Sequence, residues 1–219
     1  MTATCAICNG RKFGPGPGGR MSFAGIAPRC LNCGSLERHR FLRQVWNAIS
    51  QDSKKSKRVI QFSNDTSVEK SWFLDYELSI YGGKNSLDLQ SIDRADSCYD
   101  IAICNHVLEH VEDDKRAFRE LMRILNPSGF LQMTVPNPVR MSVTEDWGYP
   151  DTDRHGHFRH YGLDLISRFK SAEPTSYMFY VDSADPITGT NDFVFFWAKS
   201  ERSLNKLKSD LDKNFEIFH

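Results

Sequence analysis

The chain has 219 residues, of which 40% are apolar and 26% charged, and its 28 basic and 28 acidic residues balance to a net charge of zero. This composition is typical of an ordinary globular protein and excludes a disordered chain or a fibre. No apolar run approaches the roughly 20 residues of a membrane span, and the N-terminus lacks the pattern of a secretion signal, so we expect a cytoplasmic protein without a membrane-spanning segment.

The two parts of the chain carry opposite charge. Residues 1–58 contain eleven Lys or Arg and two Asp or Glu, whereas residues 59–219 contain 17 and 26. A basic module can face nucleic acid, and it can equally be held against an acidic surface of the same protein. Because the basic residues are dispersed and form no block, the sequence favours the second interpretation over a nucleic-acid partner.

Four of the six cysteines form two CxxC pairs, which are separated by 21 residues. Each pair places two thiolates on one tight turn, and two such turns complete a tetrahedral zinc site. Disulfides are disfavoured without a secretion signal, and a redox CxxC would not occur twice. The sequence therefore predicts a structural zinc ion with a closed ligand shell, held by Cys5, Cys8, Cys30 and Cys33.

The first predicted helix covers residues 35–49, with Ser35 as its N-cap and an apolar stripe on one face. A polar linker follows, and from Arg58 onwards predicted strands alternate with predicted helices. Strands are expected at residues 59–62, 77–81, 86–89, 99–104, 130–135, 177–181 and 193–198. Helices are expected at residues 66–74, 113–125 and 162–170, and from Leu204 to the end. This alternation predicts an α/β fold with a parallel sheet covered on both faces.

Two segments after Arg58 carry a resemblance to a known family. Residues 99–114, YDIAICNHVLEHVEDD, resemble the fourth strand and following turn of class I S-adenosylmethionine-dependent methyltransferases of type 11. Residues 120–131, ELMRILNPSGFL, are similar to the helix-to-strand passage of that family. The cysteine pairs, together with GSLERHR at 34–40 and RHYG at 159–162, resemble a subfamily that carries a zinc module.

The resemblance implies a doubly wound, mostly parallel Rossmann-like sheet, and a final strand joined without a helix should run antiparallel to it. A small zinc-ribbon-like module should precede the sheet. The expected units are a zinc module with its following helix (1–50), a methyltransferase domain (58–200) with an insertion or lid (136–161), and a C-terminal helix (201–219).

The resemblance also implies a site for S-adenosylmethionine beyond the carboxyl ends of the strands, where strand order reverses. The expected cofactor contacts are Phe62, Ser63, Asp65, Tyr81, Asp88, Leu89 and Asn105. The chain departs from the family at two positions. The turn after the first strand has no glycine, although Asp65 matches the acid of relatives that share the zinc module. The second strand ends in YGG at 81–83, without the acid that binds the ribose hydroxyls in the family.

Residues 106–110, HVLEH, fit the H-x-x-E-H pattern of inverted zinc proteases. A protease needs this pattern inside a helix, and here it directly follows a predicted strand. A metal-assisted role is an alternative, because some ubiquinone-pathway O-methyltransferases hold a divalent ion with a similar Glu-His segment. The favoured interpretation is that His106 faces the cofactor or substrate as a candidate catalytic residue, whereas His110 packs structurally.

Residues 151–161, DTDRHGHFRHY, form a second histidine cluster inside the predicted lid. His157 is a candidate general base, because an unperturbed imidazole titrates near neutrality. Arg159 is suited to hold a carboxylate or phosphate, and Tyr161 is a further candidate for substrate binding. The alternative is a solvated loop with charge pairs such as Asp153 with Arg159.

Together these features predict a methyltransferase that uses S-adenosylmethionine and acts on a small-molecule or glycan-type acceptor. Two other functions remain open: a methyltransferase-like scaffold without catalysis, which the missing ribose acid would explain, and a zinc protein that binds nucleic acid. The enzyme hypothesis requires a hollow where the first, third and fourth strands end. A side chain such as Phe62 or Tyr81 that filled this hollow would exclude it.

Overall fold

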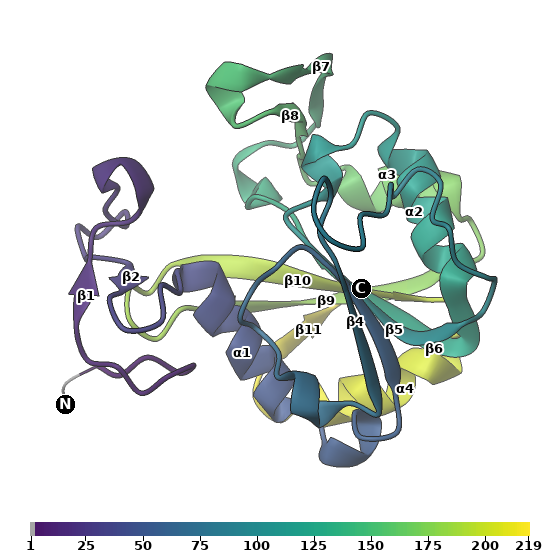
Figure 1. Ribbon diagram of the computed structural model, residues 1–219, viewed down its shortest axis with the longest axis horizontal. Coiled ribbons are helices and arrows are strands. Elements are labelled where there is room, and N and C mark those ends of the chain that lie inside the picture. Colours follow the sequence, from purple (N-terminus) through teal and green to yellow (C-terminus); the bar gives the residue numbers. More distant parts are fainter. Residues whose placement is uncertain (1–2) are drawn as a thin grey trace.

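Seven strands of the computed structural model, which describes residues 3–219, form one central sheet with the order β11-β9-β10-β6-β5-β3-β4 (Figure 1). In chain order they are β3 (Arg58–Phe62), β4 (Asp75–Ser79), β5 (Tyr99–Asn105), β6 (Leu125–Thr134), β9 (Tyr177–Ala184), β10 (Asn191–Ala198) and β11 (Glu216–Phe218).

The direction of the strands confirms the predicted Rossmann-like sheet. Strands β4, β3, β5 and β6 are parallel to one another, whereas β10 runs antiparallel to both β6 and β9. Strand β11 was not expected, because the C-terminal segment was predicted to be only a helix. It pairs with β9 and extends the sheet at the edge opposite β4.

Helices cover both faces of the sheet. Helices α1 (Glu37–Ala48) and α4 (Glu201–Leu211) lie on one face, and α2 (Asp114–Ile124) and α3 (Leu165–Ala172) lie on the other (Figure 1). Successive side chains of a strand point to opposite faces, so one strand supplies both cores. In β5, Ile101 and Ile103 pack with the α1 and α4 side, whereas Ala102 and Cys104 pack with the α2 and α3 side.

The predicted helix at residues 66–74 is wrong. This segment contains only a single turn of 3-10 helix, Lys70–Trp72, before β4 begins. The guanidinium of Arg43 in α1 donates to the carbonyl oxygens of Thr66 and Ser67, at 2.8 Å each. A side chain from α1 thus satisfies these two carbonyl oxygens, so they do not require the backbone hydrogen bonds of an α-helix.

The predicted strand at residues 86–89 is also wrong, although its alternating pattern is real. Leu87 and Leu89 are buried, and Ser86 and Asp88 are exposed, as in a strand that covers a core. The backbone N–H of Leu87 instead donates to the Ser79 hydroxyl, at 3.2 Å, and no neighbouring strand pairs with the segment. Strand β4 itself lies two residues earlier than predicted, which places Tyr81 beyond its end.

The N-terminal module contains a short pair of strands, β1 (Phe13–Gly14) and β2 (Arg29–Cys30). The helix that follows, α1, packs its apolar side against the sheet. Ser35 is not its N-cap. Leu36 occupies that position, and its N–H donates to Nδ1 of His39 at 3.1 Å.

Basic residues before residue 59 pair with acids that come later in the chain. Arg40 forms a two-pronged ion pair with Asp185, and both side chains are fully buried. Arg43 pairs with Glu69 through a single contact, from Nη1 to Oε1 at 2.6 Å, near the surface. These contacts agree with the interpretation that the charge asymmetry holds two surfaces of one protein together.

The insertion after β6 forms a hairpin of β7 (Glu145–Asp151) and β8 (His157–His160), which stands at the carboxyl edge of the sheet (Figure 1). Other 3-10 turns lie at Pro17–Gly19, Gln51–Ser53, Leu108–His110, Pro138–Arg140 and Thr152–Arg154. Among the described residues, no helix has both the length and the apolar character needed to cross a membrane.

Candidate functional site

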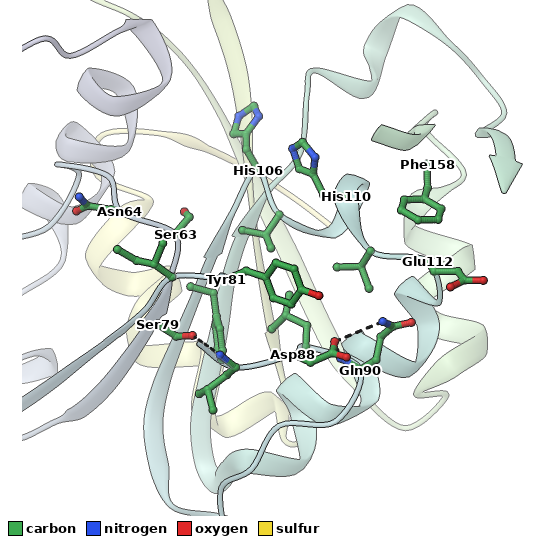
Figure 2. Close-up of a pocket in the computed structure, with 16 residues that line it drawn as sticks. Ser63, Asn64, Ser79, Tyr81, Asp88, Gln90, His106, His110, Glu112 and Phe158 are labelled. Atoms are coloured by element: carbon green, nitrogen blue, oxygen red, sulfur yellow. Dashed lines mark hydrogen bonds between the residues drawn. The ribbon is translucent and has the colours of Figure 1, made fainter. Parts of the chain in front are cut away.

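A cavity of about 610 Å³ lies beyond the carboxyl ends of the parallel strands (Figure 2). Its volume falls in the range of small-molecule sites. It lies where strand order reverses, because β4 follows β3 to one side and β5 lies on the other. It is lined by Phe62, Ser63, Asn64, Ser79, Ile80, Tyr81, Leu87, Asp88, Leu89, Gln90, His106, Val107, His110, Val111, Glu112 and Phe158.

Five of the seven expected cofactor contacts line this cavity. They come from the turn after β3, the end of β4 and the segment with buried leucines, and they are Phe62, Ser63, Tyr81, Asp88 and Leu89. Neither aromatic ring fills the hollow. Phe62 is packed into the core with 3% of its surface exposed, whereas Tyr81 lies at the rim with 79% exposed. The requirement of an open hollow is therefore met.

The other two expected contacts, Asp65 and Asn105, line a smaller adjoining cavity of about 150 Å³. Asn105 is 4% exposed, and its amide makes three hydrogen bonds. Its Nδ2 donates to Asp65 Oδ2 at 3.0 Å, and its Oδ1 accepts from Gln132 at 2.8 Å and from Thr134 at 3.1 Å. The position of Asn105 thus fixes the Asp65 carboxylate, and Ser63 and His106 line both cavities.

Two residues at this edge have left-handed backbone conformations that cost energy outside glycine. Ser63 has a φ of 82° and His106 a φ of 51°. Hydrogen bonds to the ends of neighbouring strands hold both: Ser63 N donates to Ser79 O at 3.1 Å, and His106 N donates to Thr134 O at 3.0 Å. The sheet therefore imposes a bend at both positions, and it directs the His106 ring into the cavities.

Two carboxylates line the large cavity, and neither lies at the end of β4. Asp88 is exposed, and its Oδ1 accepts from the Gln90 N–H at 2.8 Å. Glu112 follows the turn after β5, and sequence reasoning missed it because its surroundings are set by folding. Glu77, inside β4, is not available to bind a ligand, because Arg94 and Tyr99 already occupy its carboxylate. Burial would raise the pKa of its carboxyl, but hydrogen bonds from Arg94 and Tyr99 keep that pKa below its usual value.

Sequence reasoning also missed Arg38 and His39, which line the small cavity. Both lie in the first turn of α1, next to the turn after β3. Burial lowers the pKa of the His39 imidazole to about 4, with a further contribution from Arg38. A neutral imidazole and a guanidinium therefore face the same small space. Nothing in the sequence around the first turn of α1 indicates that Arg38 and His39 line a cavity.

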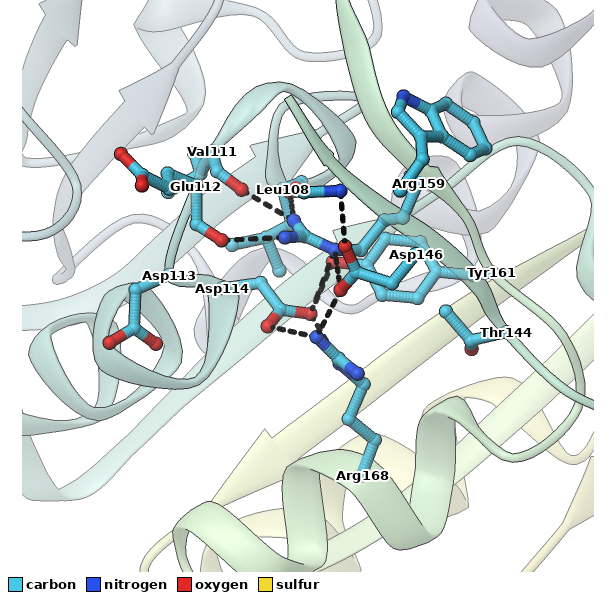
Figure 3. Close-up of polar contacts among 12 residues, drawn as sticks. Leu108, Val111, Glu112, Asp113, Asp114, Thr144, Asp146, Arg159, Tyr161 and Arg168 are labelled. Atoms are coloured by element: carbon cyan, nitrogen blue, oxygen red, sulfur yellow. Dashed lines mark hydrogen bonds and ion pairs between the residues drawn. The ribbon is translucent and has the colours of Figure 1, made fainter. Parts of the chain in front are cut away.

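Arg159 and Tyr161 do not line either cavity, so the expected contacts with a substrate do not fit this geometry (Figure 3). Arg159 is 1% exposed, and its guanidinium donates to the carbonyl oxygens of Leu108, Val111 and Glu112. The Tyr161 hydroxyl donates to Asp114 at 2.8 Å. Arg159 joins the hairpin to the turn after β5, and Tyr161 joins the chain after β8 to the start of α2. Of this hairpin only Phe158 reaches the large cavity.

His157 lies outside both cavities, beside the turn that follows β5. Its ring contacts the His110 ring edge-on, with 4.5 Å between centroids, and burial lowers the pKa of the His157 imidazole to about 4. His110 is exposed and lines the large cavity, which differs from the structural packing expected for it. Ligand atoms of Glu109, His110 and His157 lie within 4.8 Å of one another.

The four N-terminal cysteines converge as predicted. Their Sγ atoms lie within 4.8 Å of one another, with 3.8 Å between Cys5 and Cys33 and 3.6 Å between Cys8 and Cys30. A tetrahedron of Zn–S bonds has edges of about 3.8 Å when each bond is about 2.3 Å. The cluster thus has the size that a zinc ion requires.

The fold and the site define a methyltransferase-like α/β protein, and the sequence comparison agrees. Residues 36–172 match the methyltransferase domain family, and the chain belongs to this family. No curated protein matches the chain at a significant level. The cysteine module lies before the matched residues.

The chain is similar to solved structures at low sequence identity. One is the Burkholderia thailandensis 1,6-didemethyltoxoflavin-N1-methyltransferase with bound 1,6-didemethyltoxoflavin and S-adenosylhomocysteine. It has a TM-score of 0.52 and 11% identity over 73% of this chain and 78% of that chain. Another is an S-adenosylmethionine-dependent methyltransferase from Mesorhizobium loti, with a TM-score of 0.46 and 12% identity over 70% of this chain and 95% of that one.

Proposed function

We propose that the protein is an S-adenosylmethionine-dependent methyltransferase and that its cofactor binds in the large cavity. The observation that carries the proposal is the position of this cavity, at the reversal of strand order and beside the ends of β3, β4 and β5. Membership of the methyltransferase domain family supports the same function.

The residues around the cavity suit the parts of this cofactor. Leu87 and Leu89 supply an apolar wall for the adenine ring, and Phe62 supplies another. Asp88 is the carboxylate that we assign to the ribose hydroxyls, in place of the acid missing from the end of β4. When bound, the cofactor supplies an electrophilic methyl group on a sulfonium centre, so the protein needs mainly to place the acceptor in line with it.

We further propose that His106 faces the acceptor, because its ring lines both cavities and its Nε2 has no partner within the described chain. A ring nitrogen in this position is suited to take the proton that the acceptor loses on methylation. The acceptor is proposed to be a small molecule or a glycan-type compound. The support is the lining of the large cavity, which continues from the proposed cofactor residues to Phe158 of β8.

Titration calorimetry with S-adenosylmethionine and S-adenosylhomocysteine tests the cofactor proposal. We expect Asp88→Ala to weaken the binding of both by at least about tenfold, because a charge-assisted hydrogen bond to a hydroxyl contributes about 1.5–3 kcal/mol. Asp93→Asn is the matched control, since Asp93 is an exposed acid outside both cavities. Absence of heat at millimolar cofactor would favour the catalytically inactive scaffold.

We also propose that Cys5, Cys8, Cys30 and Cys33 hold a structural zinc ion. Four thiolates leave no open position, so the ion would stabilise the module and take no part in methyl transfer. We expect Cys30→Ser to contain one zinc fewer per chain than the wild type and to lose the fold of the module, which protease digestion of the N-terminal residues would detect. Equal zinc content in both proteins would contradict the assignment.

A further inference from the structure

Glu109 carries a carboxylate that is buried without a hydrogen-bond partner among the described residues. The residue is 1% exposed, and neither carboxylate oxygen accepts a hydrogen bond. The nearest basic side chain is that of His106, whose Nδ1 lies 3.4 Å from Oε1. Burying a carboxylate in this way is expensive unless a counter-charge compensates it. The arrangement therefore indicates that a positive charge belongs beside Glu109.

Two imidazoles complete a small cluster around this carboxylate. His110 follows Glu109 in the same turn, and His157 comes from β8 of the hairpin. One ligand atom from each of the three residues lies within 4.8 Å of the others, and Nδ1 of His157 is buried without a partner. Two independent observations therefore indicate a ligand site here. Polar atoms of Glu109 and His157 are buried without a partner among the described residues, and the ligand atoms of the three side chains are close enough to bind one ion.

We propose that Glu109, His110 and His157 bind a divalent transition metal ion of the zinc class, in the wall of the large cavity. Imidazole nitrogens favour such ions over magnesium or calcium, which prefer oxygen ligands. A carboxylate with two histidines is a ligand set of catalytic zinc sites, in which a fourth position stays open. Because His110 lines the large cavity (Figure 2), a ligand in that cavity would have access to the fourth position.

Arg159 holds the two halves of this site together. It lies two residues after His157 in β8, and its guanidinium donates to the carbonyl oxygens of Leu108 at 3.1 Å and Glu112 at 2.6 Å, on either side of the ligand pair (Figure 3). The turn and the strand thus cannot separate without breaking buried hydrogen bonds. Arg159 is a positioning residue, and it gives the site the rigid support that metal ligands need.

The open position suggests what the ion does, and this step rests on the proposed methyltransferase function. An ion in the cavity wall would bind a hydroxyl or enol oxygen of the acceptor and lower the pKa of that group. The acceptor class would then be an oxygen nucleophile that can coordinate a metal. Metal binding itself is measured without cofactor or acceptor, so it can be tested even if the proposed function fails.

Equilibrium dialysis and absorption spectroscopy with Co²⁺ test the site in the full chain with its N-terminal module loaded with zinc. We expect the wild type to bind one additional Co²⁺ with the weak absorption bands of nitrogen and oxygen ligands and no thiolate charge-transfer band. Glu109→Gln and His157→Ala should weaken this binding at least tenfold. His155→Asn is the control, because His155 is an exposed neighbour outside the cluster whose left-handed conformation Asn tolerates.

Thermal unfolding separates metal binding from a purely structural role of Glu109. Without added metal, Glu109→Gln should unfold at the same or a higher temperature than the wild type, because it removes an uncompensated buried charge. With Co²⁺, the wild type and His155→Asn should gain stability and Glu109→Gln should not. A wild type that binds no Co²⁺ beyond the cysteine module, or equal binding by His157→Ala and wild type, would overturn the proposal.

Discussion

Asp185→Asn is expected to lower the free energy of unfolding by about 3–5 kcal/mol, because it leaves the Arg40 guanidinium buried without its counter-charge. Both side chains are fully buried and joined by two hydrogen bonds, at 2.7 and 2.8 Å. Asp185 also accepts from the N–H and the hydroxyl of Thr188, at 2.9 Å each, so it fixes the loop between β9 and β10. For a chain of this length the loss corresponds to a fall in midpoint temperature of about 6–20 °C.

Denaturant unfolding, followed by fluorescence, measures this effect. Asp93→Asn is the control for a loss of acidic charge at the surface, and it should change stability by less than about 0.5 kcal/mol. The double variant Arg40→Met with Asp185→Leu should recover much of the loss, since removing both charges avoids the unpaired one. If the single and double variants were equally destabilised, shape and not charge would explain the effect.

Asp114→Asn is expected to have a similar effect on stability, about 3–5 kcal/mol, and to loosen the hairpin of β7 and β8 as well. The Asp114 carboxylate is 2% exposed and accepts from Arg168 at 2.7 and 2.8 Å and from the Tyr161 hydroxyl at 2.8 Å. It therefore joins the start of α2 to α3 and to the chain after β8 (Figure 3).

Hydrogen exchange distinguishes this variant from a general loss of stability. Amides of the hairpin should exchange faster in Asp114→Asn than amides of β5 and β6. The variant loses the ion pair between Asp114 and Arg168, so that only the pair between Arg168 and Asp146 of β7, at 2.8 Å, still holds the hairpin to α3. Asp153→Asn, at an exposed position in the same hairpin, should leave the exchange pattern unchanged. Uniformly faster exchange across the sheet would contradict a local role for Asp114.

The parts of the fold that sequence reasoning predicted correctly have strong periodic patterns. The strand at 99–104 alternates between two apolar faces, and the helix at 113–125 has an apolar stripe and a clear end. The errors at 66–74 and 86–89 have a common cause. Both segments have a local pattern that fits a regular element, but distant side chains, Arg43 and Ser79, satisfy their backbone groups instead.

The candidate site was predictable only in part, for a similar reason. The positions of Phe62, Ser63 and Asp88 follow from the strand order, and these residues line the large cavity. Arg159 has the chemistry of an anion-binding residue, but carbonyl oxygens of a turn far away in the chain occupy its donors, and no local pattern indicates this.

By itself, the amino-acid sequence determined the α/β class, the cysteine cluster and the edge of the sheet at which a site lies, because these depend on local periodicity and on spacing along the chain. Tertiary structure alone decided that residues 109 and 110 meet residue 157, and that a buried ion pair joins α1 to the loop after β9. Such contacts join residues far apart in the chain, and they form only when the packing of two faces of one sheet fixes their distances.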